Sequence, residues 1–172
     1  MRPRRIGLLG GESTGKSTLA RQLADALPGL VAAEYLRDFV ASHGRAPTPD
    51  DQEGIFLTQQ AGVDAVVSAA ERANIPWVIA DPLPLMTAIY SVVYFDDDAL
   101  IASGIDDAST YDVLLWCAPD IPWQVDQGVR DGADYRDRAE TVIADLIAPA
   151  LPLHRISGSE TQRLATTLPL TS

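Results

Sequence analysis

Short runs of apolar residues alternate along the chain with segments whose apolar positions recur every three or four residues. Such runs are typical of buried parallel strands, and the longer spacing is typical of helices covering a sheet. The expected strands cover residues 5–9, 30–33, 77–80, 113–117 and 153–156. The expected helices cover residues 16–27, 35–40, 50–73, 85–93, 135–148 and 160–168. This alternation predicts an α/β fold with a parallel sheet between two helical layers.

The first expected strand runs into a glycine-rich loop and then into a helix. The loop from Gly10 to Ser17 matches the pattern G-x-x-x-x-G-K-[ST] in full. Backbone N–H groups of such a loop surround phosphate oxygens at a helix N-terminus, Lys16 reaches the β/γ-phosphates, and Ser17 binds Mg²⁺. The expected nucleotide contacts come from Gly10, Gly11, Glu12, Ser13, Thr14, Gly15, Lys16, Ser17 and Thr18.

Composition narrows the classes of partner. The chain has 172 residues, enough for a single domain over 1–172, and Lys16 is its only lysine. The formal net charge of −11 argues against nonspecific binding to nucleic acid or anionic membranes. The one cysteine, Cys117, cannot form an internal disulfide and lies in an apolar run. We therefore expect a cytoplasmic protein that binds small molecules and has a buried thiol.

Ligands of parallel α/β sheets bind beyond the carboxyl ends of the strands. Asp81 ends the third expected strand, where it can hold Mg²⁺ or cap the next helix. The residue after it is Pro82 rather than a glutamate that could activate water. The Asp-Pro pair at this strand end therefore favours transfer of a phosphoryl group to a bound hydroxyl over transfer to water.

Polar side chains also follow the second expected strand. Glu34, Arg37 and Asp38 share one face of a helix, with Tyr35 on the other face. These residues either form a solvated stripe or contact the acceptor, whose hydroxyl needs a carboxylate to accept its proton. We expect Glu34 to be catalytic and the others to contact substrate.

Gln60 stands among apolar positions of the long helix. It is either a core amide bonded to the backbone or a substrate contact, and both alternatives stay open. The acidic runs 96–98 and 106–107 are interpreted as solvated loop charge.

The segment of about 120–138 contains several arginines in an otherwise acidic chain, and we interpret it as a lid. Arg130 is the candidate for stabilising the transferred phosphoryl group, and Arg136 and Arg138 for contacting the nucleotide. Trp123 lies in the loop, where it could stack on a flat ring. Ordinary surface charge is the alternative.

Several motifs together resemble the ribosylnicotinamide kinase domain of NadR-type proteins. They are residues 10–18, Glu34-Tyr35-Leu36-Arg37-Asp38, the Asp81 strand end, and Pro122-Trp123 followed by Asp126, Gly128 and Arg130. The resemblance implies a P-loop nucleoside-kinase fold with sheet order 2-3-1-4-5, and ATP and Mg²⁺ as cofactors. It implies transfer of the γ-phosphate to the 5′-hydroxyl of nicotinamide riboside, with Asp126 among the substrate contacts. NadR-type proteins carry further domains that do not fit this length, so a stand-alone kinase domain is expected.

There are three alternatives to this function, one in the same class and two in different classes. A kinase for another nucleoside or small alcohol would share all the features of the phosphate loop. A nucleotide-binding regulatory module without turnover would share them too. A GTPase is disfavoured because guanine recognition by Asn/Thr-Lys-x-Asp needs a second lysine, which the chain lacks.

Overall fold

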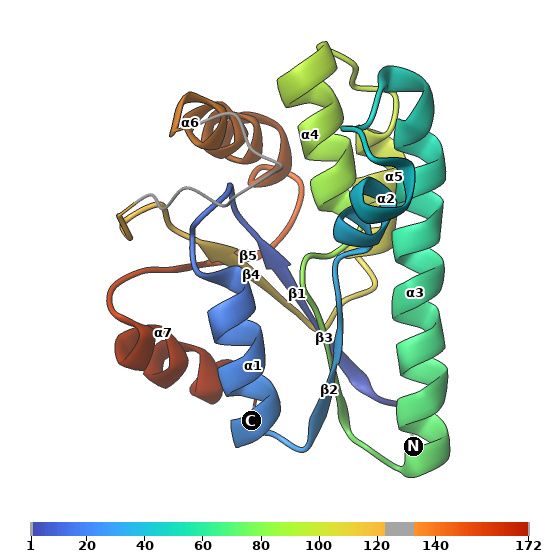
Figure 1. Cartoon of the computed structure of the whole chain (residues 1–172). Coiled ribbons are helices and arrows are strands. Elements are labelled where there is room, and N and C mark those ends of the chain that lie inside the picture. The colour runs from blue at the N-terminus through green and yellow to red at the C-terminus, as the bar shows by residue number, and fades with distance from the viewer. Residues whose placement is uncertain (1, 123–132, 172) are drawn as a thin grey trace.

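The computed structural model describes residues 2–122 and 133–171. At its centre is a five-stranded sheet in which every neighbouring pair is parallel, in the order β2-β3-β1-β4-β5 (Figure 1). The strands are β1 (Arg4–Leu9), β2 (Gly29–Ala32), β3 (Trp77–Ala80), β4 (Val113–Cys117) and β5 (Leu153–Ile156). The α/β fold and the sheet order are those expected from the sequence.

Helices cover both faces of this sheet. They are α1 (Lys16–Ala26), α2 (Tyr35–His43), α3 (Gln52–Ala73), α4 (Leu85–Phe95), α5 (Ile101–Ala108), α6 (Ala133–Val142) and α7 (Glu160–Thr167). Short 3-10 turns cover 49–51 and 168–171, and a π turn at 143–147 continues α6. Apolar side chains of α1 and α7 pack on one face, and those of α3 to α6 pack on the other. Figure 1 shows α1 and α7 side by side in front of the sheet.

Strand β1 shows how the sequence directs side chains to the two layers. Ile6 and Leu8 belong to the apolar cluster beneath α1, whereas Leu9 belongs to the cluster beneath α4. This alternation follows from the two-residue period of a strand.

Cys117 lies in β4, the strand next to β1 in the sheet. It is fully buried, and burial raises the pKa of its thiol to about 11. The expected buried thiol is confirmed.

Helix α5 was not expected from the sequence. It contains Asp106 and Asp107, so the interpretation of 106–107 as loop charge is wrong. Gly104 lies against α4, where an added Cβ would approach Leu85 Cδ1 to 2.6 Å. The helical spacing of Ile101, Ile105 and Ala108 was present in the sequence but short, and the neighbouring aspartates obscured it. Among the described residues, no helix has the length and hydropathy needed to cross a membrane.

Candidate active site

The glycine-rich loop joins β1 to α1 as the motif requires. Gly10 has a φ of 138°, and a Cβ on it would lie 2.7 Å from the carbonyl oxygen of Cys117. Gly15 is the left-handed N-cap of α1. Only glycine adopts these conformations without strain, so the two residues let the loop fold tightly against β4. Lys16 then begins α1, and its Nζ donates to the carbonyl oxygens of Gly10 and Gly11 at 2.8 and 2.7 Å.

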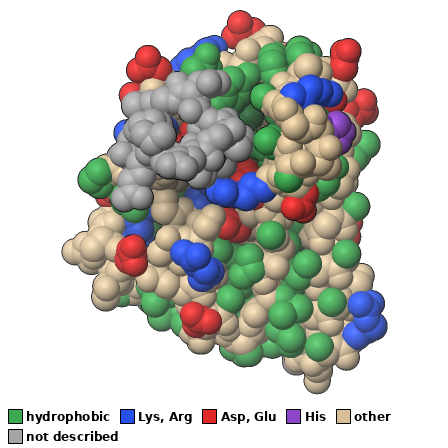
Figure 2. Space-filling view, viewed as in Figure 1, with side chains coloured by type: hydrophobic (Ala, Val, Ile, Leu, Met, Phe, Trp, Pro, Cys, Tyr) green, Lys and Arg blue, Asp and Glu red, His purple; other side chains and the backbone are tan. Residues whose placement is uncertain are grey.

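A polar cavity of about 350 Å³ opens above this loop. Its lining includes Lys16, Arg37 and Arg163 together with the carboxylates of Glu34 and Asp81. Figure 2 shows basic and acidic side chains adjoining one another near the middle of this face. Cations beside a helix N-terminus attract phosphate oxygens, so the cavity has the chemistry of a triphosphate site. The loop residues that line it are Ser13, Thr14, Gly15, Lys16, Ser17 and Thr18.

Ser17 and Asp81 also line this polar cavity. Asp81 Oδ1 is buried and accepts no hydrogen bond from the described residues. Within the described residues, no three His, Cys, Asp or Glu side chains gather closely enough to hold a metal. One carboxylate and one hydroxyl beside a phosphate site fit Mg²⁺, which keeps waters and takes its other ligands from phosphates.

A second cavity, of about 230 Å³, lies between α2, α3 and α4 and is mainly apolar. Its walls include the aromatic side chains of Tyr90, Tyr94 and Phe95. Two carboxylates, those of Glu12 and Glu34, also line the cavity, and no lysine or arginine is among its described lining residues. The cavity therefore favours a flat organic molecule that is neutral or positively charged.

Glu34 and Pro82 line both cavities and so mark the place where they meet. Glu34 is the N-cap of α2, two residues after the end of β2, and only 15% of its side chain is exposed. Arg37 Nε lies 3.3 Å from Glu34 Oε2. The sequence placed Glu34 and Asp81 after neighbouring strand ends, on the side of the sheet where ligands bind. In the structure both side chains line the polar cavity.

Gln59 links the segments that carry these two carboxylates. Its Oε1 accepts from the Tyr35 backbone N–H at 2.7 Å, and its Nε2 donates to the Pro82 carbonyl at 3.0 Å. Gln59 is 4% exposed, and it also lines the apolar cavity. A buried amide that uses both its donor and its acceptor fixes the distance between the backbones it joins. Gln59 therefore positions Glu34 relative to Asp81.

The sequence singled out the neighbouring residue, Gln60, instead, and the first alternative for it, a core amide bonded to the backbone, was wrong. Gln60 is only half-buried, and its Nε2 donates to Asp107 Oδ1 at 2.9 Å. This contact lies outside the described lining of both cavities. Burial raises the pKa of the Asp107 carboxyl group, against the opposing effect of the hydrogen bond from Gln60. The unrecognised helix α5 thus explains why the contact of Gln60 was not expected and why 106–107 was interpreted as loop charge.

Glu12 differs from the other loop residues. It was expected to contact the nucleotide, but its side chain lines the apolar cavity and is 4% exposed. The hydroxyl of Tyr94 lies 3.4 Å from Glu12 Oε1. The phosphate loop therefore contributes a carboxylate to the cavity beside it.

The remaining expected contacts lie in different places. Tyr35 and Asp38 are outside the described lining of both cavities, and Asp38 is exposed. Arg136 packs on Gly11 and donates to the Ile121 carbonyl at 3.2 Å. Arg138 is exposed and pairs with Asp96 at 3.4 Å. The structure thus brings Arg136, but not Arg138, to the phosphate loop. Trp123, Asp126 and Arg130 lie outside the described residues, and their roles stay predictions.

Sequence reasoning missed two charged residues beside the loop. Arg163 lines the polar cavity yet is only 1% exposed. Glu140 accepts from Trp116 Nε1 at 3.0 Å and from the Gly11 N–H at 3.4 Å, and burial raises the pKa of its carboxyl group. Glu140 lies inside α6 and Arg163 inside α7, so the rule that ligands bind beyond the strand ends did not single out either residue.

Comparison with known proteins agrees with this geometry. A family model described as "AAA domain" matches residues 5–163. The trifunctional NAD biosynthesis/regulator protein NadR of Salmonella typhimurium is 29% identical over 139 residues, which are 78% of this chain and 33% of that protein. NadR of Escherichia coli is 29% identical over 141 residues, or 80% of this chain and 33% of the relative. The chain thus spans about a third of the length of the curated relatives it matches.

Solved structures show the same fold. A crystal structure of NadR in complex with NR has a TM-score of 0.75 at 19% identity, over 99% of this chain and 51% of that one. Deoxyadenosine kinase from M. mycoides with bound dATP has a TM-score of 0.58 at 15% identity, over 98% of this chain and all of that one. The fold is therefore that of P-loop nucleoside kinases. With the model match over 5–163 and the complete phosphate-loop motif, the chain belongs to the AAA-domain family of P-loop proteins.

Proposed function

We propose that this protein is an ATP-dependent kinase that transfers the γ-phosphate to the 5′-hydroxyl of nicotinamide riboside, giving nicotinamide mononucleotide. The observation that carries the proposal is the position of Glu34, which lines both the polar and the apolar cavity. A kinase needs its two substrates to meet at a carboxylate that orients the acceptor hydroxyl. The similarity to NadR, one structure of which is a complex with NR, supports the choice of acceptor.

In this proposal the triphosphate of ATP lies in the polar cavity. Lys16 and the backbone N–H groups of the phosphate loop bind its β- and γ-phosphates. Ser17 and Asp81 would hold Mg²⁺, which when bound neutralises charge on the phosphate oxygens. Pro82 after Asp81 leaves no second acid there to activate water, which favours an alcohol as the acceptor.

The acceptor lies in the apolar cavity with its 5′-hydroxyl at Glu34. The 5′-oxygen forms a bond to the γ-phosphorus as the bond from that phosphorus to the β,γ-bridging oxygen breaks. The hydroxyl proton passes to the Glu34 carboxylate, and ADP leaves with the bonding electrons. Arg37, which lies 3.3 Å from Glu34, keeps the carboxylate oriented at the junction.

The charge of the apolar cavity supports nicotinamide riboside over neutral nucleosides. The nicotinamide ring of the riboside carries a positive charge, and a buried carboxylate next to aromatic rings favours a cation. Glu12 and the tyrosines Tyr90 and Tyr94 supply these groups. A kinase for another nucleoside is the second candidate, favoured by the structural similarity to deoxyadenosine kinase.

A comparison of charged and neutral acceptors tests the proposal. Nicotinamide riboside and its reduced form have nearly the same shape, but only the oxidised form carries the ring charge. We expect the oxidised form to have the lower acceptor KM, by about tenfold, the size of one charge contact. Glu12→Gln should reduce this preference and leave the KM for ATP unchanged. If the protein phosphorylates deoxyadenosine or other neutral nucleosides but not nicotinamide riboside, the acceptor assignment is overturned. That result would favour the second candidate.

A further inference from the structure

Arg163 is the largest buried charged side chain among the described residues. It lies in α7 and is 1% exposed. A guanidinium taken out of water is strongly destabilising unless its N–H donors find acceptors. Its acceptors are the carbonyl oxygens of Gly158 at 2.8 Å, Thr14 at 2.8 Å and Ala118 at 3.0 Å, and the carboxylate of Asp120.

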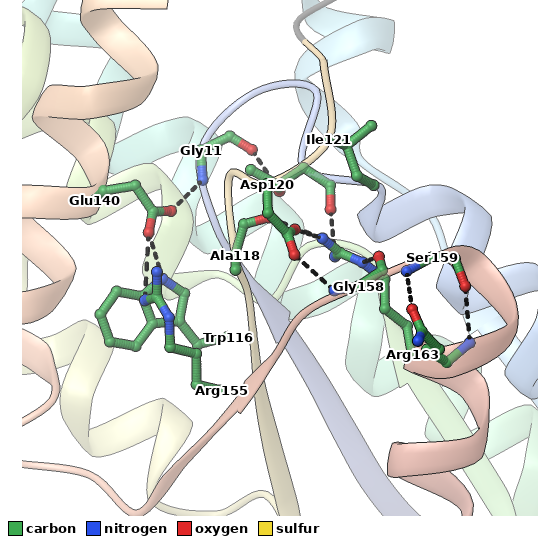
Figure 3. Close-up of polar contacts among 12 residues, drawn as sticks. Gly11, Trp116, Ala118, Asp120, Ile121, Glu140, Arg155, Gly158, Ser159 and Arg163 are labelled. Atoms are coloured by element: carbon green, nitrogen blue, oxygen red, sulfur yellow. Dashed lines mark hydrogen bonds and ion pairs between the residues drawn. The ribbon is translucent and has the colours of Figure 1, made fainter.

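These acceptors belong to separate parts of the chain. Thr14 is in the phosphate loop, Ala118 and Asp120 follow β4, and Gly158 lies in the turn between β5 and α7. Figure 3 shows the guanidinium of Arg163 pointing toward the Asp120 carboxylate, which also accepts from the Gly158 N–H at 2.6 Å. Arg163 and Asp120 therefore join the phosphate loop to the ends of two neighbouring strands.

The bond to Thr14 matters most for nucleotide binding. Thr14 is fully buried, and its Oγ1 donates to the Gly11 carbonyl at 2.8 Å within the same loop. On the opposite side of the loop, Gly11 N–H donates to Glu140 (Figure 3). The backbone of the loop is thus fixed from both sides by side chains outside the motif. Phosphate binding depends on this backbone shape, because the N–H groups must point toward one anion.

We propose that Arg163, oriented by Asp120, is a positioning residue that holds the phosphate loop in its nucleotide-binding shape. Only the planar fork of an arginine presents enough N–H groups in fixed directions to reach all four acceptors. A lysine would keep the charge and lose most of these bonds. The inference rests on the proposed function only in that a nucleotide binds at the phosphate loop; it is independent of the acceptor.

Affinity for the ATP analogue AMP-PNP with Mg²⁺, measured by calorimetry, tests this role. We expect Arg163→Lys and Asp120→Asn each to weaken binding by about tenfold or more, as for the loss of a charge-assisted hydrogen bond. The double variant should bind about as weakly as the weaker single variant, because Asp120 acts through Arg163. Asp120 is 39% exposed, so Asp120→Asn should fold even if Arg163→Lys does not. In turnover, the KM for ATP should rise and the acceptor KM should stay unchanged.

Arg4→Met is the matched control. Arg4 Nη1 donates to the Thr171 carbonyl at 3.2 Å, so Arg4 also holds the C-terminal segment, but from the other end of β1. The Arg4→Met variant should be less stable in urea and should bind AMP-PNP with unchanged affinity. The inference is overturned if folded Asp120→Asn binds within a factor of about two of wild type, or if Arg4→Met weakens binding equally. Wild-type protein that fails to bind AMP-PNP overturns it as well, whereas binding without acceptor phosphorylation refutes the proposed function alone.

Discussion

Glu34 and Arg37 form an ion pair one helical turn apart, with 3.3 Å between Oε2 and Nε, at the junction of the two cavities. Glu34 is mostly buried there, whereas 58% of the Arg37 side chain is exposed. The pair places a carboxylate between the polar cavity and the apolar one. The proposed proton transfer depends on this carboxylate.

Glu34→Gln should therefore impair turnover and not nucleotide binding. We expect kcat to fall by about 10²-fold or more, the usual contribution of a general base. The KM for ATP should stay within a factor of about two. Asp38→Asn is the control, because Asp38 is exposed on the same helix and lines neither cavity among the described residues. Equal losses in the two variants would argue that Glu34 has no special role.

Lys16→Arg should lose most phosphoryl transfer although it keeps the charge. The broad guanidinium fits the loop poorly, so a loss on the order of 10²-fold in kcat is expected. The fold should be intact, because Lys16 belongs to neither apolar cluster. Arg21→Ala removes an exposed charge from the same helix and should have little effect. A near-normal kcat in Lys16→Arg would show that phosphoryl transfer does not require a lysine at this position.

Asp107→Asn should make the protein more stable at neutral pH. Burial raises the pKa of Asp107, so the folded state binds the proton more tightly than the unfolded state does. The stability that this proton contributes is complete below the unfolded pKa of about 3.9 and is lost as pH rises through the folded pKa. The advantage of the variant should therefore grow with pH. Urea unfolding from about pH 4 to about pH 8 measures it, with exposed Asp106→Asn as control. If the free energies of unfolding of wild type and Asp107→Asn differ by the same amount at every pH, the raised pKa of Asp107 is contradicted.

Cys117 should resist alkylation in the folded protein. Its thiol is fully buried and its pKa is raised to about 11, so little reactive thiolate forms at about pH 8. Iodoacetamide followed by mass spectrometry should detect modification only after unfolding in urea. Rapid labelling of the native protein would mean that β4 opens to solvent.

Features defined by adjacent residues could be predicted from the sequence. The strand, phosphate loop and helix follow one another directly, so the motif specified its own context. Glu34 and Asp81 were found because the carboxyl ends of parallel strands share one edge of a sheet. The wide separation of these residues in sequence did not hide their proximity, since sheet topology alone brings them together.

Features set by long-range packing could not be predicted. Gln59 and Gln60 are adjacent, and a small error in the phase of α3 decides which of them is buried. Arg163 could not be singled out from the sequence, because its acceptors include a carbonyl oxygen 149 residues away. Glu12 is part of the phosphate motif by sequence, and only the fold turns it toward the second cavity.

The most direct test of the account is ADP formation by the purified chain with ATP and Mg²⁺, measured with and without nicotinamide riboside, with mass spectrometry of the product. We predict slow hydrolysis alone, strong stimulation by the riboside, and one 5′-monophosphate formed for each ADP. ADP formation at the same rate without any acceptor would contradict the central claim that the two cavities bring a nucleotide and an alcohol together at Glu34.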